Sequence, residues 1–320
     1  MKAVHCTQNG TYKDLEIVDI PEPGNPEPHQ IQVDISVRGI QFSDLVRFTG
    51  EYQVKTPHPF VVGGEAGGTV AAVGAEVEGF AVGDLVLCPG GCVEKVNISA
   101  KAATKVPAGV DLTIAASFRN NYATAYYGLQ RGQLEAGETL LVHGAAGGVG
   151  LAAVDIGKLF GARVIGTASS DDKLKVVTEL GADHVINYSD GFRDEVKALT
   201  DGKGADVIYD PVGGDVFDES VRCIAPFGRI LVLGFTSGRP ALAKTNHLLV
   251  KDASVIGYTV GGLQQHNPAL AAQNSRVLMD WLASGRINPY VSHTLPMDAI
   301  HDAYQLIVDR KVIGKVMITN

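Results

Sequence analysis

A glycine-rich run is the clearest chemical feature of this sequence. Residues 144–150 read GAAGGVG, directly after the apolar stretch TLLVH and directly before LAAVDIGKLFG, which has the pattern of a helix. Between a strand and a helix, Gly147 and Gly150 allow the backbone to turn tightly and to approach a pyrophosphate at the helix N-terminus. The order of the three parts therefore predicts a dinucleotide site. The alternative is a tight turn in an α/β domain that binds no ligand.

The end of the next strand bears on which dinucleotide binds. An NAD site usually places an Asp or Glu there, on the ribose hydroxyls. Here the strand ARVIGTA ends at Ala168 and is followed by two serines, two aspartates and a lysine, Ser169 to Lys173. Ser169 and Ser170 can donate hydrogen bonds and Lys173 can make a charge-assisted contact with a 2'-phosphate, so we expect NADPH. In the alternative, Asp171 and Asp172 oppose the phosphate and Lys173 is solvated; their place at a helix start favours a capping role.

Three segments must position these residues. Residues 1–122 show short strands broken by turn residues, which predicts a β-rich domain with a largely antiparallel, partly closed sheet. Residues 123–265 alternate strand and helix, which predicts a mostly parallel sheet wrapped by helices. Residues 266–320 read as a helix near 268–284, a strand, a second helix and a final strand, and we expect them to rejoin the first domain. The fold class is therefore α/β, with a doubly wound Rossmann domain inserted in a β-rich domain.

Composition narrows the classes of function. Hydrophobic residues make up 45% of the chain, charged residues 19%, and the net charge is -8. A nucleic-acid partner needs a basic face, which we do not find in the sequence. No window reaches the ~20 apolar residues that span a bilayer, and the N-terminus lacks an apolar signal core, so we expect a cytoplasmic protein without a membrane partner.

The cysteines are few and scattered, at positions 6, 88, 92 and 223. This argues against a disulfide framework. Cys88 and Cys92 are close enough to begin a metal site, but no second Cys or His pair follows them, as a structural zinc would need. We therefore expect free thiols and no metal.

Several segments together resemble a known family. They include GIQFSDLVRFTGEY at 39–52, VVGGEAGGTVAAVG at 61–74, YATAYYGL at 122–129, LGADHVINY at 180–188, YDPVGGDVF at 209–217 and GRILVLGFTSG at 228–238. In this order they resemble the zinc-independent NADPH:quinone oxidoreductases, the zeta-crystallin-like branch of the medium-chain dehydrogenase/reductase superfamily. The resemblance implies a GroES-like substrate domain, a Rossmann domain, and a nicotinamide in the cleft between them.

The resemblance also implies cofactor-binding positions. They are Thr124, Gly147, Gly148, Val149, Ser169, Ser170, Lys173, Tyr188, Gly234, Phe235 and Ser237. Tyr188 and Lys173 would flank the 2'-phosphate. In zinc-dependent relatives a Cys and a His hold the catalytic metal, whereas this chain has Gln41 and Gly64 at the matching positions. Neither is a zinc ligand, so we expect no metal site.

The resemblance further suggests catalytic residues. Tyr52 is expected to contact substrate and to donate a proton, or else to form an aromatic wall. Gln41 and Asp44 match polar cleft positions of the family, although relatives often carry Asn in place of Gln41, and Asp44 can instead orient its loop. Arg119 departs from the family pattern. It either recognises an anionic group of the substrate or pairs with a surface acid.

These features lead to three hypotheses. Without a Lewis acid the substrate must itself delocalise the charge that arrives with a hydride, which favours NADPH-dependent reduction of a quinone. The alternative is reduction of the double bond of an enone, a 2-alkenal or an enoyl thioester. A hypothesis from another class is a crystallin-like structural protein that binds NADPH. The resemblance also implies a homodimer formed through an edge strand of the Rossmann sheet.

Overall fold

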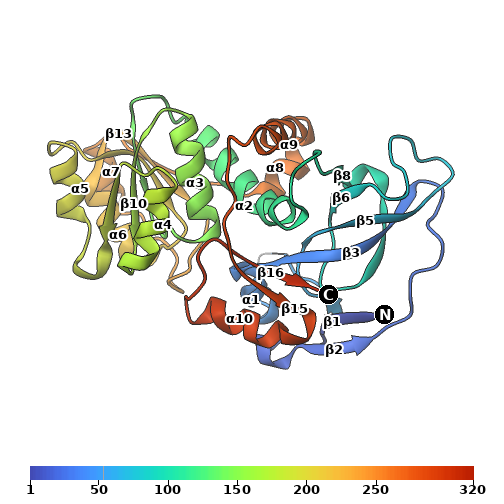
Figure 1. The fold of residues 1–320 in the computed structure, drawn as a ribbon. Helices are drawn as coiled ribbons and strands as arrows, with labels where there is room; N and C mark the ends of the chain where they lie inside the picture. The colour runs from blue at the N-terminus through green and yellow to red at the C-terminus, as the bar shows by residue number, and fades with distance from the viewer. Residues whose placement is uncertain (53) are drawn as a thin grey trace. The chain divides into compact units, whose positions relative to one another are not determined.

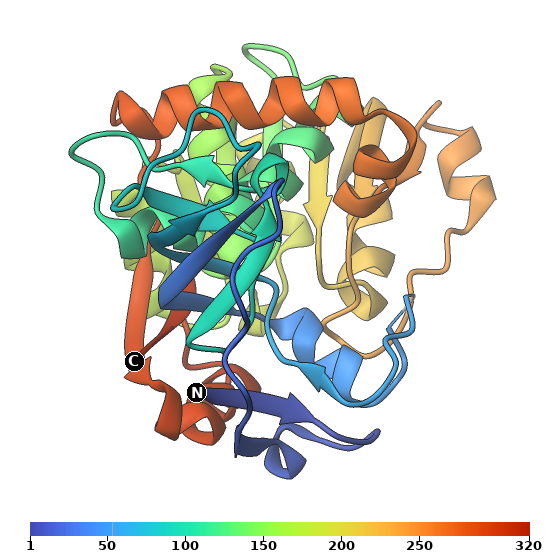
Figure 2. The same ribbon diagram turned by 90° about the vertical axis from the view of Figure 1, so that its right-hand side faces the viewer.

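The computed structural model describes residues 1–52 and 54–320 of the chain. The contacts divide it into two units. The first contains Met1–Arg119 and Tyr290–Asn320, and the second contains Asn120–Pro289. Both termini lie in the first unit, and the second unit is therefore an insertion within it (Figures 1 and 2).

The first unit is built on two β-sheets. A seven-stranded sheet has the order β15-β16-β3-β5-β6-β8, with β7 also paired to β3. These strands are β3 (Gln30–Ile40), β5 (Glu65–Val73), β6 (Leu85–Cys88), β7 (Lys95–Ser99), β8 (Thr104–Lys105), β15 (Val291–Pro296) and β16 (Lys315–Thr319). All pairs are antiparallel except β15 with β16, which is parallel. The smaller sheet contains β1 (Lys2–Cys6), β2 (Glu16–Asp19) and β4 (Phe60–Val61).

Helices complete the first unit. Its α-helices are α1 (Phe42–Phe48) and α10 (Ile300–Val308), and its short 3-10 turns are η1 (Tyr12–Asp14), η2 (Ala100–Ala102) and η4 (Met297–Ala299). One core cluster joins α1, α10 and β16 through Phe48, Tyr304 and Val316. Tyr304 meets Phe48 edge-on, with ring centroids 5.2 Å apart. This packing ties the last strand and helix of the chain to the beginning of the first unit.

The second unit contains an all-parallel six-stranded sheet in the order β11-β10-β9-β12-β13-β14. Its strands are β9 (Thr139–Val142), β10 (Arg163–Ala168), β11 (His184–Asn187), β12 (Ala205–Asp210), β13 (Ile224–Val232) and β14 (Ser254–Gly257). Central strands such as β9 and β12 are buried at every position, as expected for a parallel sheet covered on both faces. The predicted α/β fold class, with a doubly wound parallel-sheet domain inserted in a β-rich domain, is confirmed.

The second unit also contains helices, some of which cover the faces of this sheet (Figure 1). They are α3 (Gly148–Leu159), α4 (Asp171–Glu179), α5 (Arg193–Leu199), α6 (Gly214–Cys223), α7 (Thr245–Leu249), α8 (Val260–His266) and α9 (Pro268–Ala283), with η3 (Tyr188–Asp190) after β11. The long α2 (Leu112–Arg131) runs from the first unit into the second. Helices α3 and α4 pack on β9 to β11, while α6 packs on β12 and β13 and contacts α5 and α7.

The return of the chain to the first unit differs from the expected boundary at residue 266. Helix α9 belongs to the second unit, and the chain re-enters the first unit only at Tyr290. The reason is side-chain packing. Trp281 of α9 meets Tyr126 edge-on at 5.3 Å between centroids, and Asn274 exchanges hydrogen bonds with Gln130 of α2.

None of the helices in the described part of the chain is long and apolar enough to cross a membrane.

Candidate active site

Most of the candidate cofactor residues follow strands of the parallel sheet at one edge of it. Strand β9 has β10 on one side and β12 on the other, so the strand order reverses direction beside it. The carboxyl ends of parallel strands meet at one edge of a sheet, and ligands of doubly wound folds bind where the order reverses. The predicted glycines follow β9, and the predicted serines follow β10. Tyr188 follows β11, and Gly234, Phe235 and Ser237 follow β13. The topology thus brings together residues that are far apart in sequence.

The glycine loop provides room at the N-terminus of α3. Gly144 has φ +56, a left-handed conformation that favours glycine. Gly147 is the N-cap of α3 and, as a glycine, contributes no side-chain cap. The first N–H groups of a helix have no intrahelical partner and attract anions. A Cβ on Gly148 would lie 2.4 Å from Nδ2 of Asn121, so a side chain larger than that of glycine would collide with Asn121 at the start of α3. The loop therefore fits a pyrophosphate, and its backbone N–H groups would hold it.

Gly150 is the tightest position of this loop. A Cβ there would lie 2.2 Å from the carbonyl oxygen of Gly144 and 2.8 Å from Cα of Ala145, both backbone atoms that cannot rotate away. We expect Gly150→Ala to displace the loop, lowering the free energy of unfolding by about 1–3 kcal/mol and weakening dinucleotide binding about tenfold or more. Thermal melts and a fluorescence titration with NADPH measure both effects. Gly261→Ala is the matched control, because nothing lies within 4 Å of a Cβ at Gly261; equal effects in both variants would contradict the role given to Gly150.

His143, between β9 and the glycine loop, is buried. Its Nδ1 lies 3.0 Å from Oγ1 of Thr167, and its Nε2 lies 2.8 Å from Oγ of Ser220. The Ser220 hydroxyl donates to the carbonyl of Val216, so it accepts the hydrogen bond from Nε2–H of His143. Burial lowers the pKa of His143 to about 3.

This lowered pKa predicts a pH dependence of stability. A neutral His143 stabilises the fold fully above the unfolded-state pKa of about 6.5, and this contribution is lost as the pH falls towards the folded-state pKa of about 3. Between these values His143 should add a slope of about 1.4 kcal/mol per pH unit to the unfolding free energy. Urea denaturation across this range measures the slope. His143→Gln should lower this slope by about 1.4 kcal/mol per pH unit, which corresponds to one proton fewer taken up on unfolding. An unchanged slope would show that another group is responsible.

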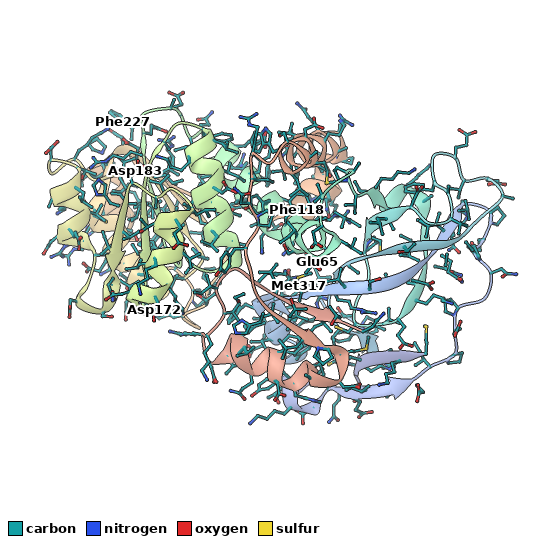
Figure 3. All side chains as sticks on the ribbon, viewed as in Figure 1. Glu65, Phe118, Asp172, Asp183, Phe227 and Met317 are labelled. Carbon is teal, nitrogen blue, oxygen red and sulfur yellow. The ribbon has the colours of Figure 1, made fainter. Side chains whose placement is uncertain are left out.

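At the ribose end of the predicted site, the polar side chains at the start of α4 make hydrogen bonds and ion pairs with other side chains. Ser170 is the N-cap of α4 and makes no side-chain capping bond. Asp171 accepts a hydrogen bond from Nδ2 of Asn187 at 2.9 Å. Asp172, labelled in Figure 3, is exposed and pairs with Lys175 at 2.8 Å. Both aspartates lie in the first turn of α4, as expected for residues at a helix start, and each also has a side-chain partner.

Asn187 was missed by the sequence reasoning. It ends β11 and lies opposite Ala168, the last residue of β10. Its Oδ1 accepts hydrogen bonds from the N–H and hydroxyl of Ser189. The signal that points to it is a polar residue at the end of a strand that neighbours the one ending at Ala168.

The remaining candidate cofactor residues also lie in the second unit. Thr124 is on α2, where its hydroxyl donates to the carbonyl of Asn120 at 2.7 Å. Val149 is in the first turn of α3, Lys173 in the first turn of α4, and Tyr188 begins η3. Gly234, Phe235 and Ser237 follow β13; a Cβ on Gly214 would meet Oγ of Ser237 at 2.8 Å, so this segment packs on the start of α6.

In the first unit, Asp44 organises the start of α1. Its carboxylate is 1% exposed, and Oδ2 accepts hydrogen bonds from the N–H of Gln41 at 2.9 Å and from the hydroxyl of Tyr304 at 3.2 Å. Burial raises the pKa of Asp44, against opposing effects of these hydrogen bonds and of Arg47 and Lys315. Asp44 therefore holds Gln41 in place, and its burial suits orientation of the loop rather than contact with a substrate.

Tyr52 lies beside Arg47 of α1. The guanidinium carbon of Arg47 is 5.4 Å from the centroid of the Tyr52 ring. A cation over the face of a phenol is attracted to it by about 0.5–1 kcal/mol at an exposed site. Arg47 also acts electrostatically on Asp44. Arg47 therefore connects Tyr52 with Asp44, which in turn holds the N–H of Gln41.

A buried ion pair lies next to these residues, and the sequence reasoning did not identify it. Lys315 Nζ contacts Glu65 Oε1, with side-chain exposures of 3% and 6%. Glu65 on β5 and Met317 on β16 both lie opposite Gly39 of β3 (Figure 3). A Cβ on Gly39 would lie 2.6 Å from Oε1 of Glu65 and 2.8 Å from Cε of Lys315, so glycine leaves the space that the pair occupies.

Arg119 lies on α2 and acts electrostatically on the Cys88 thiol, whose pKa burial raises to about 11. Among the described residues no carboxylate oxygen lies within 4.0 Å of Arg119, so the expected alternative of an ion pair with a surface acid is not observed there. All four cysteines are free and buried.

The donor set does not suit zinc. Gln41 and Gly64 stand where zinc-dependent relatives have Cys and His, and an amide and a glycine are not zinc ligands. Within residues 1–52 and 54–320 no group of three or more His, Cys, Asp or Glu could hold a metal ion.

Comparisons with known proteins agree with this architecture. Residues 27–124 match the alcohol dehydrogenase GroES-like domain, and residues 148–275 match the zinc-binding dehydrogenase family. The quinone oxidoreductase-like protein 2 homolog of Nematostella vectensis is 39% identical over 99% of this chain and 88% of its own length.

Solved structures give the same picture. Escherichia coli quinone oxidoreductase complexed with NADPH has a TM-score of 0.90 and 28% identity, over 100% of both chains. The CurK enoyl reductase has a TM-score of 0.89 and 25% identity, over 99% of this chain and 98% of its own. The chain is therefore an oxidoreductase that belongs to the quinone oxidoreductase-like, zeta-crystallin-like family of the medium-chain dehydrogenase/reductase superfamily.

Proposed function

We propose that this enzyme reduces quinones by hydride transfer from NADPH without zinc. The observation that carries the proposal is the combination of the glycine loop at the N-terminus of α3 with a ribose end where Asn187 and Lys175 engage both aspartates. Engaged carboxylates oppose a 2'-phosphate less than free ones do. The Escherichia coli relative complexed with NADPH supports the same cofactor.

The chain's own residues would act as follows. NADPH, when bound, supplies the hydride. A quinone delocalises the arriving negative charge, so no Lewis acid is needed to polarise its oxygen. Tyr52, steadied by Arg47, contacts the substrate and donates a proton to its oxygen. Gln41, held through its N–H by Asp44, offers its amide as a hydrogen-bonding group to the same substrate.

A substrate panel tests this function. NADPH and NADH oxidation is followed at 340 nm with 1,4-benzoquinone, 9,10-phenanthrenequinone, a 2-alkenal, crotonyl thioester and a simple ketone. We expect NADPH-dependent turnover of the quinones and none of the ketone. Ketone turnover would overturn the zinc-independent mechanism, and a preference for NADH would overturn the cofactor assignment.

A second candidate is reduction of the double bond of an enone, a 2-alkenal or an enoyl thioester. The likeness to the CurK enoyl reductase favours it, as does Arg119, which could bind an anionic part of such a substrate. Faster turnover of the alkenal or thioester than of the quinones would establish this alternative.

The cofactor assignment has its own test in Lys173. Lys173→Ala should weaken NADPH binding about tenfold, a loss typical of one charge-assisted hydrogen bond, and should leave NADH affinity unchanged. Fluorescence titrations with both nucleotides measure the ratio. Lys203→Ala is the control, because Lys203 belongs to the same unit and pairs with Asp206, away from the candidate cofactor positions. Equal loss of NADH and NADPH affinity in Lys173→Ala would show that Lys173 does not contact the 2'-phosphate.

We also propose that the enzyme forms a homodimer through β14, one of the two edge strands of the parallel sheet. An unpaired strand edge can continue a sheet into a second copy. Sizing chromatography with light scattering should give twice the chain mass of 33.7 kDa; a monomer would reject this assembly.

A further inference from the structure

The second unit has a cavity that the proposed reaction does not use. Its volume is about 400 Å³. It is lined by Arg193, Lys197, Val221, Arg222, His247, Val250 and Lys251. These residues come from α5, the C-terminal end of α6, and α7 with the turn that follows it. None of them is a candidate cofactor residue. Helix α6 begins beside Ser237 and reaches the cavity at Val221, seven residues later, roughly 10 Å along its axis.

The lining is strongly cationic. Arg193, Lys197, Arg222 and Lys251 are four positive charges around one cavity of a chain whose net charge is -8. His247 adds a ring that can donate a hydrogen bond. Such a concentration of like charge is unfavourable in a partly enclosed space unless anions offset it.

The neighbouring acids offset only part of this charge. Asp194 lies 2.9 Å from Arg193, and Glu219 lies 3.2 Å from Arg193 and 3.7 Å from Arg222. In the described part of the chain, neither Lys197 nor Lys251 has a carboxylate oxygen within 4.0 Å. Two carboxylates therefore lie close to the two arginines of the cavity, and the positive charges of Lys197 and Lys251 are not offset at this distance.

Cys223, the residue that follows Arg222 at the end of α6, shows that two of these cations converge. It is buried, and burial raises the pKa of its thiol to about 12. Lys197 and Arg193 both act in the opposite direction on this pKa. Their charges are therefore close to the same buried point, although they lie a helical turn apart on α5.

We propose that this cavity binds a small polyanion that carries two or more phosphate groups. Arginine presents a fork of donors that matches phosphate oxygens, and lysine supplies a mobile point charge. The volume is within the range of small-molecule sites and exceeds what a single phosphate fills. Val221 and Val250 add an apolar wall, which suits the body of a phosphorylated metabolite.

The test is a calorimetric titration of the full chain with inorganic pyrophosphate at low salt, in the presence of saturating NADPH so that the glycine loop at α3 is already occupied. We expect one saturable site per chain whose affinity falls as sodium chloride is added. The double variant Lys197→Gln/Lys251→Gln should weaken binding at least about tenfold, the effect of losing two charge-assisted contacts. Its melting temperature without ligand should be equal to or above that of the wild type, because it removes like-charge repulsion.

Two control variants test whether pyrophosphate binds in this cavity or elsewhere on the protein. Lys175→Gln/Lys203→Gln makes the same change in net charge with lysines of the same unit that pair with Asp172 and Asp206 outside the cavity. It should leave pyrophosphate binding unchanged. Lys173→Gln, at the ribose end of the predicted NADPH site, should do the same. Absence of saturable binding, equal weakening in the control double variant, or weakening by Lys173→Gln alone would each overturn the proposal.

Discussion

Replacing Lys315 with alanine is expected to lower the free energy of unfolding by about 3–5 kcal/mol. Lys315 and Glu65 form an ion pair in which both side chains are almost fully buried. Removing the ammonium takes away the cation that offsets the Glu65 carboxylate in a medium of low polarity, where burying a charge is very unfavourable. Urea or thermal denaturation of the purified variant measures the loss.

The double variant Glu65→Leu/Lys315→Met is the decisive control. It removes both charges and keeps apolar volume, so it should recover most of the stability lost in Lys315→Ala. A double-mutant cycle on Glu65→Leu, Lys315→Met and the double variant gives their coupling energy. Additive losses would show that the two charges do not depend on each other, and the stabilising role of the buried pair would then be rejected.

Replacing Asp44 with alanine is expected to have the second-largest effect. The N–H of Gln41 and the hydroxyl of Tyr304 would both lose their acceptor, which corresponds to about 2–4 kcal/mol of stability. Gln41 would no longer be held at the start of α1, so we also expect kcat for the preferred quinone to fall about tenfold, the scale of a misplaced catalytic group. Denaturation and initial-rate kinetics measure the two effects.

Asp44→Asn separates positioning from proton transfer. Its amide oxygen can still accept from Gln41 and Tyr304, so we expect most of the stability and of kcat to be retained, with an unchanged pH profile. Loss of turnover in Asp44→Asn with normal stability would instead make Asp44 a proton donor. Asp14→Ala is the matched control, since Asp14 accepts from the N–H of Thr11 in a similar local turn but is exposed; it should leave kcat unchanged.

Features that depend on neighbouring residues could be predicted from the sequence. The run from 139 to 161 predicts a strand, a glycine turn and a helix, and the structure contains β9, the Gly144–Gly150 loop and α3. Turn chemistry and hydrophobic periodicity act over a few residues, so they can be read directly from the chain. The alternation of strand and helix then leads to a parallel sheet, because crossover connections allow few other topologies.

The partners of polar groups depend on tertiary structure. The contact that Asp171 makes with Asn187 depended on parallel pairing, which brings Asn187 opposite Ala168. The end of the inserted unit depended on Trp281 packing against Tyr126, which places α9 in that unit.

The chain by itself determined the Rossmann loop, the strand and helix order and the types of residue available for chemistry. The tertiary structure decided which of them meet: Asp44 with Tyr304, 260 positions apart, Glu65 with Lys315, and the four cations around one cavity. The physical reason is that burying a charge or a hydrogen-bonding group requires a partner at a few ångströms. Local sequence shows that such a group exists, and only the packed fold brings its partner within reach.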